Sequence, residues 1–160
     1  APFGAGLLYV RNEKIREIWY PEDDPLSDKI TKFERLGTRS FPTEMAIGSA
    51  LDFHRMIGPS RKQERLWYLK NYWMEQVRDF PKVHTHTSLD RRFGCVIGLV
   101  SIDGIKPGDL VSRLFTQYKI HTTGIEWEGM SGVRVTPHVY TQTYDLDKFV
   151  KAIKEIAATA

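Results

Sequence analysis

The chain has 160 residues, of which 41% are hydrophobic and 27% charged, and its formal net charge is +3. These values suit one globular domain with a sizeable core and argue against wholesale disorder. The basic residues are interspersed with acidic ones, so nucleic acid is not an expected partner. No apolar run approaches the ~20 residues of a membrane helix, and no signal-peptide pattern is seen, so no membrane partner is expected. A single cysteine fits a cytoplasmic protein.

The first third of the chain contains too few elements for a core of its own. Residues 7–10, "LLYV", follow Gly4 and Gly6 and predict a strand buried on both faces. A polar, proline-containing loop is expected over residues 19–31, and a helix over residues 43–57 that ends at Gly58 and Pro59. One strand, one loop and one helix therefore predict the trailing edge of a larger sheet domain.

The rest of the chain alternates between helical and strand periodicity. A helix is expected from Ser60, with Gln63 completing a capping box, up to Pro81. Shorter patterns follow: strands over residues 82–87, 93–103, 119–127 and 132–137, a helix after Pro107, and a final helix capped by Thr143. This order predicts an α+β fold, with helices packed on a mostly antiparallel sheet.

Arg134 lies in the predicted strand over residues 132–137, between two valines. Because side chains alternate along a strand, Val133 and Val135 are expected to face the core while Arg134 projects from the opposite face. On position alone, the simpler interpretation is an arginine that faces solvent. The functional interpretation is that its planar guanidinium binds a carboxylate through paired hydrogen bonds.

A candidate phosphate contact precedes the first long helix. Gly37, Thr38 and Arg39 combine backbone amides, a hydroxyl and a cation just before the helix starts. Such a set can bind a phosphate at a helix N-terminus. Taken alone, it is equally the composition of an ordinary helix lead-in, which is the simpler interpretation.

The histidine and cysteine positions give little support for metal or thiol chemistry. His84 and His86 lie two residues apart on one face of a predicted strand. No cysteine or nearby histidine completes a ligand set, so an exposed edge strand is favoured and no metal is expected. Cys95 has strand-core neighbours and no adjacent base, which predicts a buried, inert thiol.

Four segments in order carry a family resemblance: "GAGLLYVR", "KFERLGTRSFP", "IGLVSIDG" and "KIHTTGIEWEGMSGVRVTPHVYTQTYDLDKFVKAI". Together they resemble the C-terminal part of fold-type I, pyridoxal phosphate-dependent enzymes of the class V aminotransferase family. The isopenicillin N epimerase-like group is the most similar within it. The resemblance covers essentially the whole chain. It implies that residues 1–58 are the trailing edge of a large cofactor-binding domain and that residues 59–160 form the C-terminal small domain.

The resemblance also implies roles for individual residues. Arg134 stands where the family has the arginine that holds the α-carboxylate of an amino-acid substrate. Gly37 and Thr38 match the Gly-Thr segment that contacts the phosphate of pyridoxal phosphate in the neighbouring subunit of a homodimer. Gly4 and Gly6 match glycines that follow the cofactor-bonding lysine.

The chain departs from the family pattern at that lysine, which in the family lies just upstream of "APFGAG". Lys14 and Lys29 do not match the motif, so no catalytic residue is assigned and this chain alone is expected to be inactive. Residues 123–132, before Arg134, hold no cysteine, which disfavours desulfurase chemistry by that route. Transamination, epimerisation, lyase chemistry and hydrolytic cleavage all stay open.

A hypothesis of a different class is a non-catalytic, stand-alone α+β module for protein–protein interaction. Apolar surface along residues 7–10 and the first helix would then be exposed. For either hypothesis we expect a homodimer or a higher self-associated state.

Overall fold

The computed structural model describes residues 4–21, 24–34 and 37–160. It separates into two compact units, Ala1–Ile57 and Gly58–Ala160, and each is considered by itself. The predicted helix stop lies at their junction: α2 (Phe41–Ile57) ends there, and α3 (Pro59–Val77) begins after Gly58. Gly58 has a φ of +86°, which glycine adopts without steric cost. The roles assigned to residues 1–58 and 59–160 stay predictions.

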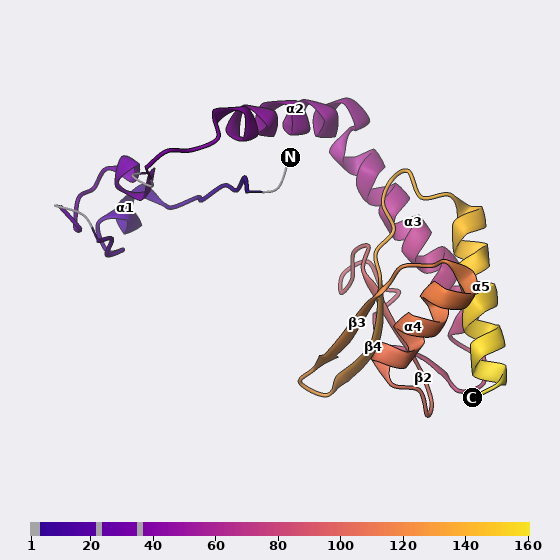
Figure 1. Cartoon of the computed structure of the whole chain (residues 1–160). Coiled ribbons are helices and arrows are strands. Elements are labelled where there is room, and N and C mark those ends of the chain that lie inside the picture. Colours follow the sequence, from indigo (N-terminus) through magenta and orange to yellow (C-terminus); the bar gives the residue numbers. More distant parts are fainter. Residues whose placement is uncertain (1–3, 22–23, 35–36) are drawn as a thin grey trace. The chain divides into compact units, whose positions relative to one another are not determined.

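The second unit is the α+β fold that the sequence predicts. After α3 it contains β1 (Val83–Thr85), β2 (Gly98–Ile102), α4 (Pro107–Tyr118), β3 (Thr123–Trp127), β4 (Met130–Val135) and α5 (Thr143–Ala158). The strands form one antiparallel sheet in the order β1-β2-β4-β3, so β1 and β3 are its edges. In Figure 1, α4 and α5 lie to one side of the strands, with α3 packed along α5.

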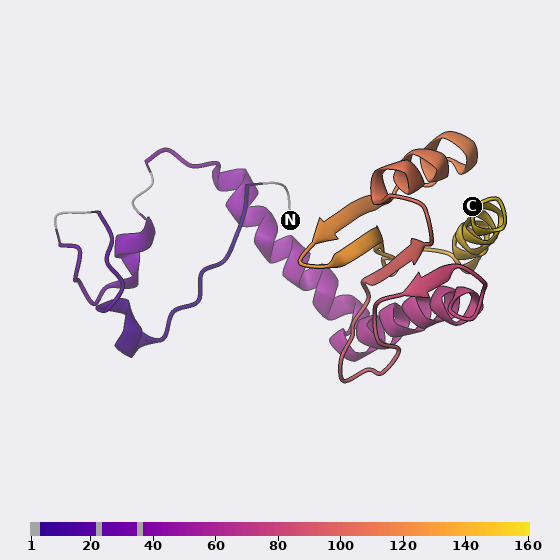
Figure 2. The same cartoon turned by 90° about the horizontal axis from the view of Figure 1, so that it is seen from below.

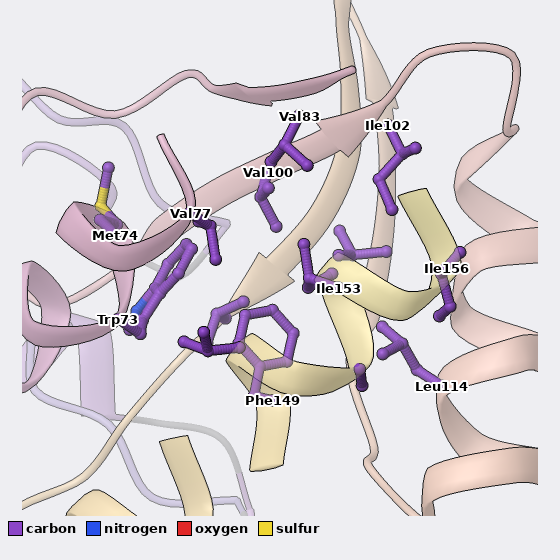
Figure 3. Packing of buried hydrophobic residues seen from close by; sticks show 14 of the residues in the cluster. Trp73, Met74, Val77, Val83, Val100, Ile102, Leu114, Phe149, Ile153 and Ile156 are labelled. Atoms are coloured by element: carbon purple, nitrogen blue, oxygen red, sulfur yellow. The ribbon is translucent and has the colours of Figure 1, made fainter. Parts of the chain in front are cut away.

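The core lies between one face of the sheet and these helices. Trp73 of α3 is completely buried, and its ring meets Phe149 of α5 edge to face, with centroids 5.3 Å apart. Figure 3 shows side chains of β1 and β2, among them Val83 and Val100, pointing toward this pair and toward Ile153. The predicted helical stripes are confirmed. In α4, Leu110 and Leu114 are buried; in α5 the buried stripe holds Leu146, Phe149, Val150, Ile153 and Ala157.

Two predicted helix caps are wrong by one or two positions. α3 has Gly58 as its N-cap and no side-chain cap bond, so Ser60 does not cap it. Pro59 takes the first helical position because its missing N–H needs no partner there. In α5 the N-cap is Gln142, whose side chain and that of Asp145 form a reciprocal capping box, while Thr143 is already inside the helix.

The first unit contains α1 (Asn12–Ile15), a 3₁₀ helix η1 (Ile30–Glu34) and α2, whose chain path Figure 2 follows. The buried strand predicted over residues 7–10 is wrong, because these residues are not in a strand and Leu7 and Tyr9 are 80% and 85% exposed. A strand must pair its backbone groups with a neighbour, and no other described segment of this unit is a strand. Of the loop predicted over residues 19–31, Glu22 and Asp23 lie outside the described residues.

No helix among the described residues is long and apolar enough to cross a membrane.

Replacing Gly98 with Ala should destabilise the second unit. A Cβ atom there would lie 2.3 Å from Trp73 Cζ2 and 3.3 Å from Met74 Sδ, both in fully buried side chains. We expect the free energy of unfolding to fall by about 2 kcal/mol, measured by urea denaturation followed through tryptophan fluorescence. Gly108→Ala in α4 is the matched control, because its added Cβ meets nothing within 4 Å. Equal losses of stability in the two variants would contradict this packing.

Candidate functional site

Arg134 projects from the face of the sheet that the helices leave open. Val133 and Val135 on either side of it are buried, whereas Arg134 is exposed, as the strand period predicts. The buried valines fix β4 against the core, so the backbone that carries Arg134 is held firmly. The side chain therefore extends from a rigid base into solvent.

Among the described residues, no acidic side chain pairs with Arg134. Its cross-strand partners are Leu99 of β2 and Thr123 of β3. The ion pairs within the second unit join other residues, and no side-chain hydrogen bond links the Arg134 guanidinium to another described residue. The N–H donors of the Arg134 guanidinium are thus available to an external anion.

The turn between β3 and β4 decides which side chain stands beside Arg134. Trp127 pairs with Met130, so the turn contains two residues, Glu128 and Gly129, and both have positive φ, 45° and 79°. Such two-residue turns match the twist of a hairpin and fix its register. This register places Thr123 opposite Arg134. Thr123 was not predicted as a site residue. The Glu-Gly pair between two strand patterns is the sequence signal that could have indicated the tight hairpin, and with it the residue opposite Arg134.

Contacts from α3 hold the loop that leads into β2. The completely buried Lys70 donates from Nζ to the Ser88 carbonyl at 2.6 Å, and Trp67 Nε1 donates to the Gly94 carbonyl at 2.8 Å. Burial lowers the pKa of the Lys70 ammonium, because a charged group loses hydration there. The anchored loop ends at Gly98, the first residue of β2. The next residue, Leu99, is the cross-strand partner of Arg134.

Gly37 and Thr38 lie in the first unit, just ahead of α2, and both are exposed. Gly37 has a φ of +76°. The Ser40 hydroxyl lies 2.8 Å from that of Thr43, and the Arg39 Nε lies 3.1 Å from Glu44 Oε1. Hydroxyls and first-turn amides at the positive end of a helix are the donors that a phosphate needs.

A hollow of about 810 Å³ opens beside this helix start. Arg39, Ser40 and Thr43 line it, together with Gly4 and Gly6, which the sequence analysis also singled out. Gly37 and Thr38 do not line this hollow, whereas the acidic Glu34 does. The hydroxyls of Ser40 and Thr43 and the Arg39 guanidinium are the donors that could meet a phosphate there. The site is partly neutralised by Glu44, which pairs with Arg39.

Lys32 holds together the segment that leads to this site, a role that no sequence pattern indicated. Its side chain is buried, and Nζ donates to the carbonyls of Ile15 at 2.6 Å, Ile18 at 2.8 Å and Pro25 at 3.1 Å. The ammonium thus joins the end of α1, the following loop and η1. A lysine in a polar stretch is normally an exposed surface residue, so its burial could not be predicted from the sequence.

Among the described residues, none of His84, His86 and Cys95 forms a hydrogen bond or ion pair with Arg134. β1 is an edge strand, as predicted, and contains His84, while His86 follows its last residue. Both histidines are exposed, and they bond through Nε2 to Asp103 Oδ1 at 2.8 Å and Ser101 Oγ at 2.7 Å. Across the described ranges, no three His, Cys, Asp or Glu residues are grouped to hold a metal. The buried thiol predicted at Cys95 is wrong: Cys95 is exposed, because β2 begins only at Gly98 and Cys95 lies in the preceding loop.

Comparison with curated proteins finds relatives along almost the whole chain. Isopenicillin N epimerase of Amycolatopsis lactamdurans is 23% identical over 178 residues, which cover 98% of this chain and 44% of that protein. A probable hercynylcysteine sulfoxide lyase of Mycobacterium tuberculosis (strain CDC 1551 / Oshkosh) is 27% identical over 173 residues, covering 99% and 42%. The chain is related to the class V aminotransferase family. It spans less than half the length of these relatives.

Solved structures agree with this family relationship at the level of the fold. The cysteine desulfurase CsdA of Escherichia coli superposes with a TM-score of 0.75 at 16% identity, over 96% of this chain and 42% of that one. No family model matches the chain. The predicted resemblance to class V aminotransferases and the predicted fold class are both confirmed.

Replacing Lys32 with Met should loosen the first unit, because three backbone carbonyls lose a charged donor. We expect a loss of local stability of about 2 kcal/mol. Hydrogen exchange should then accelerate at the amides of residues 12–20 and 30–34. Lys29→Met is the control, since Lys29 is exposed. Unchanged exchange in Lys32→Met would show that the three hydrogen bonds do not hold this segment together.

Proposed function

We propose that this chain is part of a pyridoxal phosphate-dependent enzyme that acts on an amino acid, and that Arg134 binds the α-carboxylate of the substrate. The observation that carries the proposal is a guanidinium on the open face of a rigid sheet that pairs with no acidic side chain in the part of the chain that the structure describes. The relationship to isopenicillin N epimerase and its family adds support, because the resemblance aligns Arg134 with the family's carboxylate-binding arginine.

The chemistry of Arg134 suits this role. A guanidinium presents two parallel N–H donors to the two oxygens of a carboxylate, which fixes orientation as well as position. The strand beneath it cannot shift without moving Val133 and Val135 out of the core. A substrate held in this way would keep its Cα and amino group in a constant place relative to β4, as a reaction at Cα requires.

The same proposal assigns Gly37 and Thr38 to the phosphate of the cofactor in a neighbouring subunit of a homodimer. The Thr38 hydroxyl and the amides ahead of α2 would hold the phosphate, and the helix dipole would favour its negative charge. When bound, pyridoxal phosphate supplies the electron sink for bonds at Cα. A cytoplasmic location belongs to the proposal as well.

A second candidate function is a protein-interaction module. It is favoured by α2, which buries none of its residues and leaves Met45 and Met56 78% and 80% exposed. Exposed apolar side chains in this number favour association with another protein surface. The two candidates differ in one requirement: the module needs neither Arg134 nor Thr38.

Replacing Arg134 with Ala in the full-length protein should raise the KM for its amino-acid substrate about 100-fold, because the charge-assisted contacts to the carboxylate are lost. Arg134→Lys should recover only part of the loss, since an ammonium lacks the paired geometry. Steady-state kinetics measures both. Arg113→Ala on the exposed side of α4 is the control. Unchanged kinetics in Arg134→Ala would remove the arginine from the site.

Replacing Thr38 with Val should weaken cofactor binding by the full-length protein about tenfold, because one hydrogen bond to a charged phosphate is lost. Absorbance titration with pyridoxal phosphate gives the Kd. Thr31→Val in η1 is the matched control, because Thr31 is exposed on the same unit. The assignment fails if the two variants bind the cofactor equally well.

A further inference from the structure

Thr123 and Arg134 form a directly opposed pair on the open face of the sheet. They are partners in the register of β3 and β4, and both side chains are exposed. Opposed residues of an antiparallel pair place their Cβ atoms about 5 Å apart. The Thr123 hydroxyl therefore lies next to the base of the Arg134 side chain, on the same face of the sheet.

The Thr123 hydroxyl is as uncommitted as the guanidinium. No hydrogen bond joins it to another residue of the described ranges, in contrast to neighbouring polar groups such as His86, which bonds Ser101. Thr122, one residue earlier, is buried and faces the other way. The polar atom of Thr123 is thus exposed, on the correct face and available as a donor.

We propose that the Thr123 hydroxyl is the second donor of the carboxylate site, beside Arg134. This inference rests on the proposed carboxylate role of Arg134. An ionised carboxylate has about four acceptor positions, and a bidentate arginine occupies two of them. A neutral hydroxyl donor adds a third bond without adding charge. The pair selects ligands with a free carboxylate over amides and esters.

The other neighbours of Arg134 are less well placed to supply such a donor. Leu99, its partner on β2, is apolar, and Gly132, two residues earlier on β4, has no side chain. His86, which follows the last residue of β1, donates its backbone N–H to the Leu99 carbonyl, so it lies on the far side of Leu99 from Arg134. Two strand spacings place it about 10 Å from Arg134. Thr136, two residues after Arg134, is exposed and also has a hydroxyl, but it lies about 7 Å along the chain. Thr123, directly opposite Arg134, is the nearer hydroxyl.

The test uses this chain and the smallest carboxylate, acetate, with acetamide as the uncharged probe. Titration to about 0.5 M, followed through ¹H–¹⁵N shifts of the amides of residues 123–124 and 133–135, gives the Kd at controlled ionic strength. We expect saturating shifts with acetate and none with acetamide. Thr123→Val should weaken acetate binding by about three- to tenfold. Thr123→Ser should restore it, because the hydroxyl returns.

Two control variants separate the possible results. Thr116→Val on α4 should leave the Kd unchanged, since its hydroxyl bonds the Ser112 carbonyl within the helix. Acetate binding that is lost in Arg134→Ala but unaltered in Thr123→Val would overturn the role of Thr123 and leave that of Arg134 standing. Absence of acetate binding to the unsubstituted chain, or equal binding of acetate and acetamide, would overturn both.

Discussion

The close contact between Trp73 and Gly98 determines how the sheet and helices of the second unit fit together. Gly98 opens β2, a central strand, and the indole ring occupies the space that any side chain at this position would need. The same ring packs edge to face on Phe149, which brings α3 and α5 onto a common face of the sheet. An aromatic pair of this kind contributes both buried area and a preferred geometry. The opposite face is left for Arg134.

This arrangement makes the proposed carboxylate site rigid without the free-energy cost of burying the guanidinium. The valines beside Arg134 are buried by the helical layer, and the guanidinium itself stays hydrated until a ligand arrives. A permanently buried arginine would need an internal acid, which would compete with the substrate. In the first unit Lys32 has the opposite arrangement: its ammonium is buried and its donors are committed to carbonyls, so it organises the backbone and is not available to a ligand.

The sequence predicted the fold where local pattern and packing agree. The stripes of α4 and α5, the edge position of His84 and His86 and the outward direction of Arg134 all follow from periodicity. Errors arose where a neighbour decided the outcome. Residues 7–10 have strand composition but no strand beside them among the described residues. Cys95 has core-like neighbours in sequence, yet the loop held by α3 leaves it exposed.

By itself, the sequence determined that the Arg134 side chain points to the opposite face of the strand from Val133 and Val135. The reason is that the alternation of side chains along a strand is a local property of the backbone. Its ordered segments also indicated the resemblance to class V aminotransferases, with which the relatives agree. Only the tertiary structure decided that Thr123 stands beside Arg134 and that no acid of the sheet pairs with it. Those facts depend on strand order and register, which arise when separate segments pair through the turn at Glu128 and Gly129 and through the packing of β2 under Trp73.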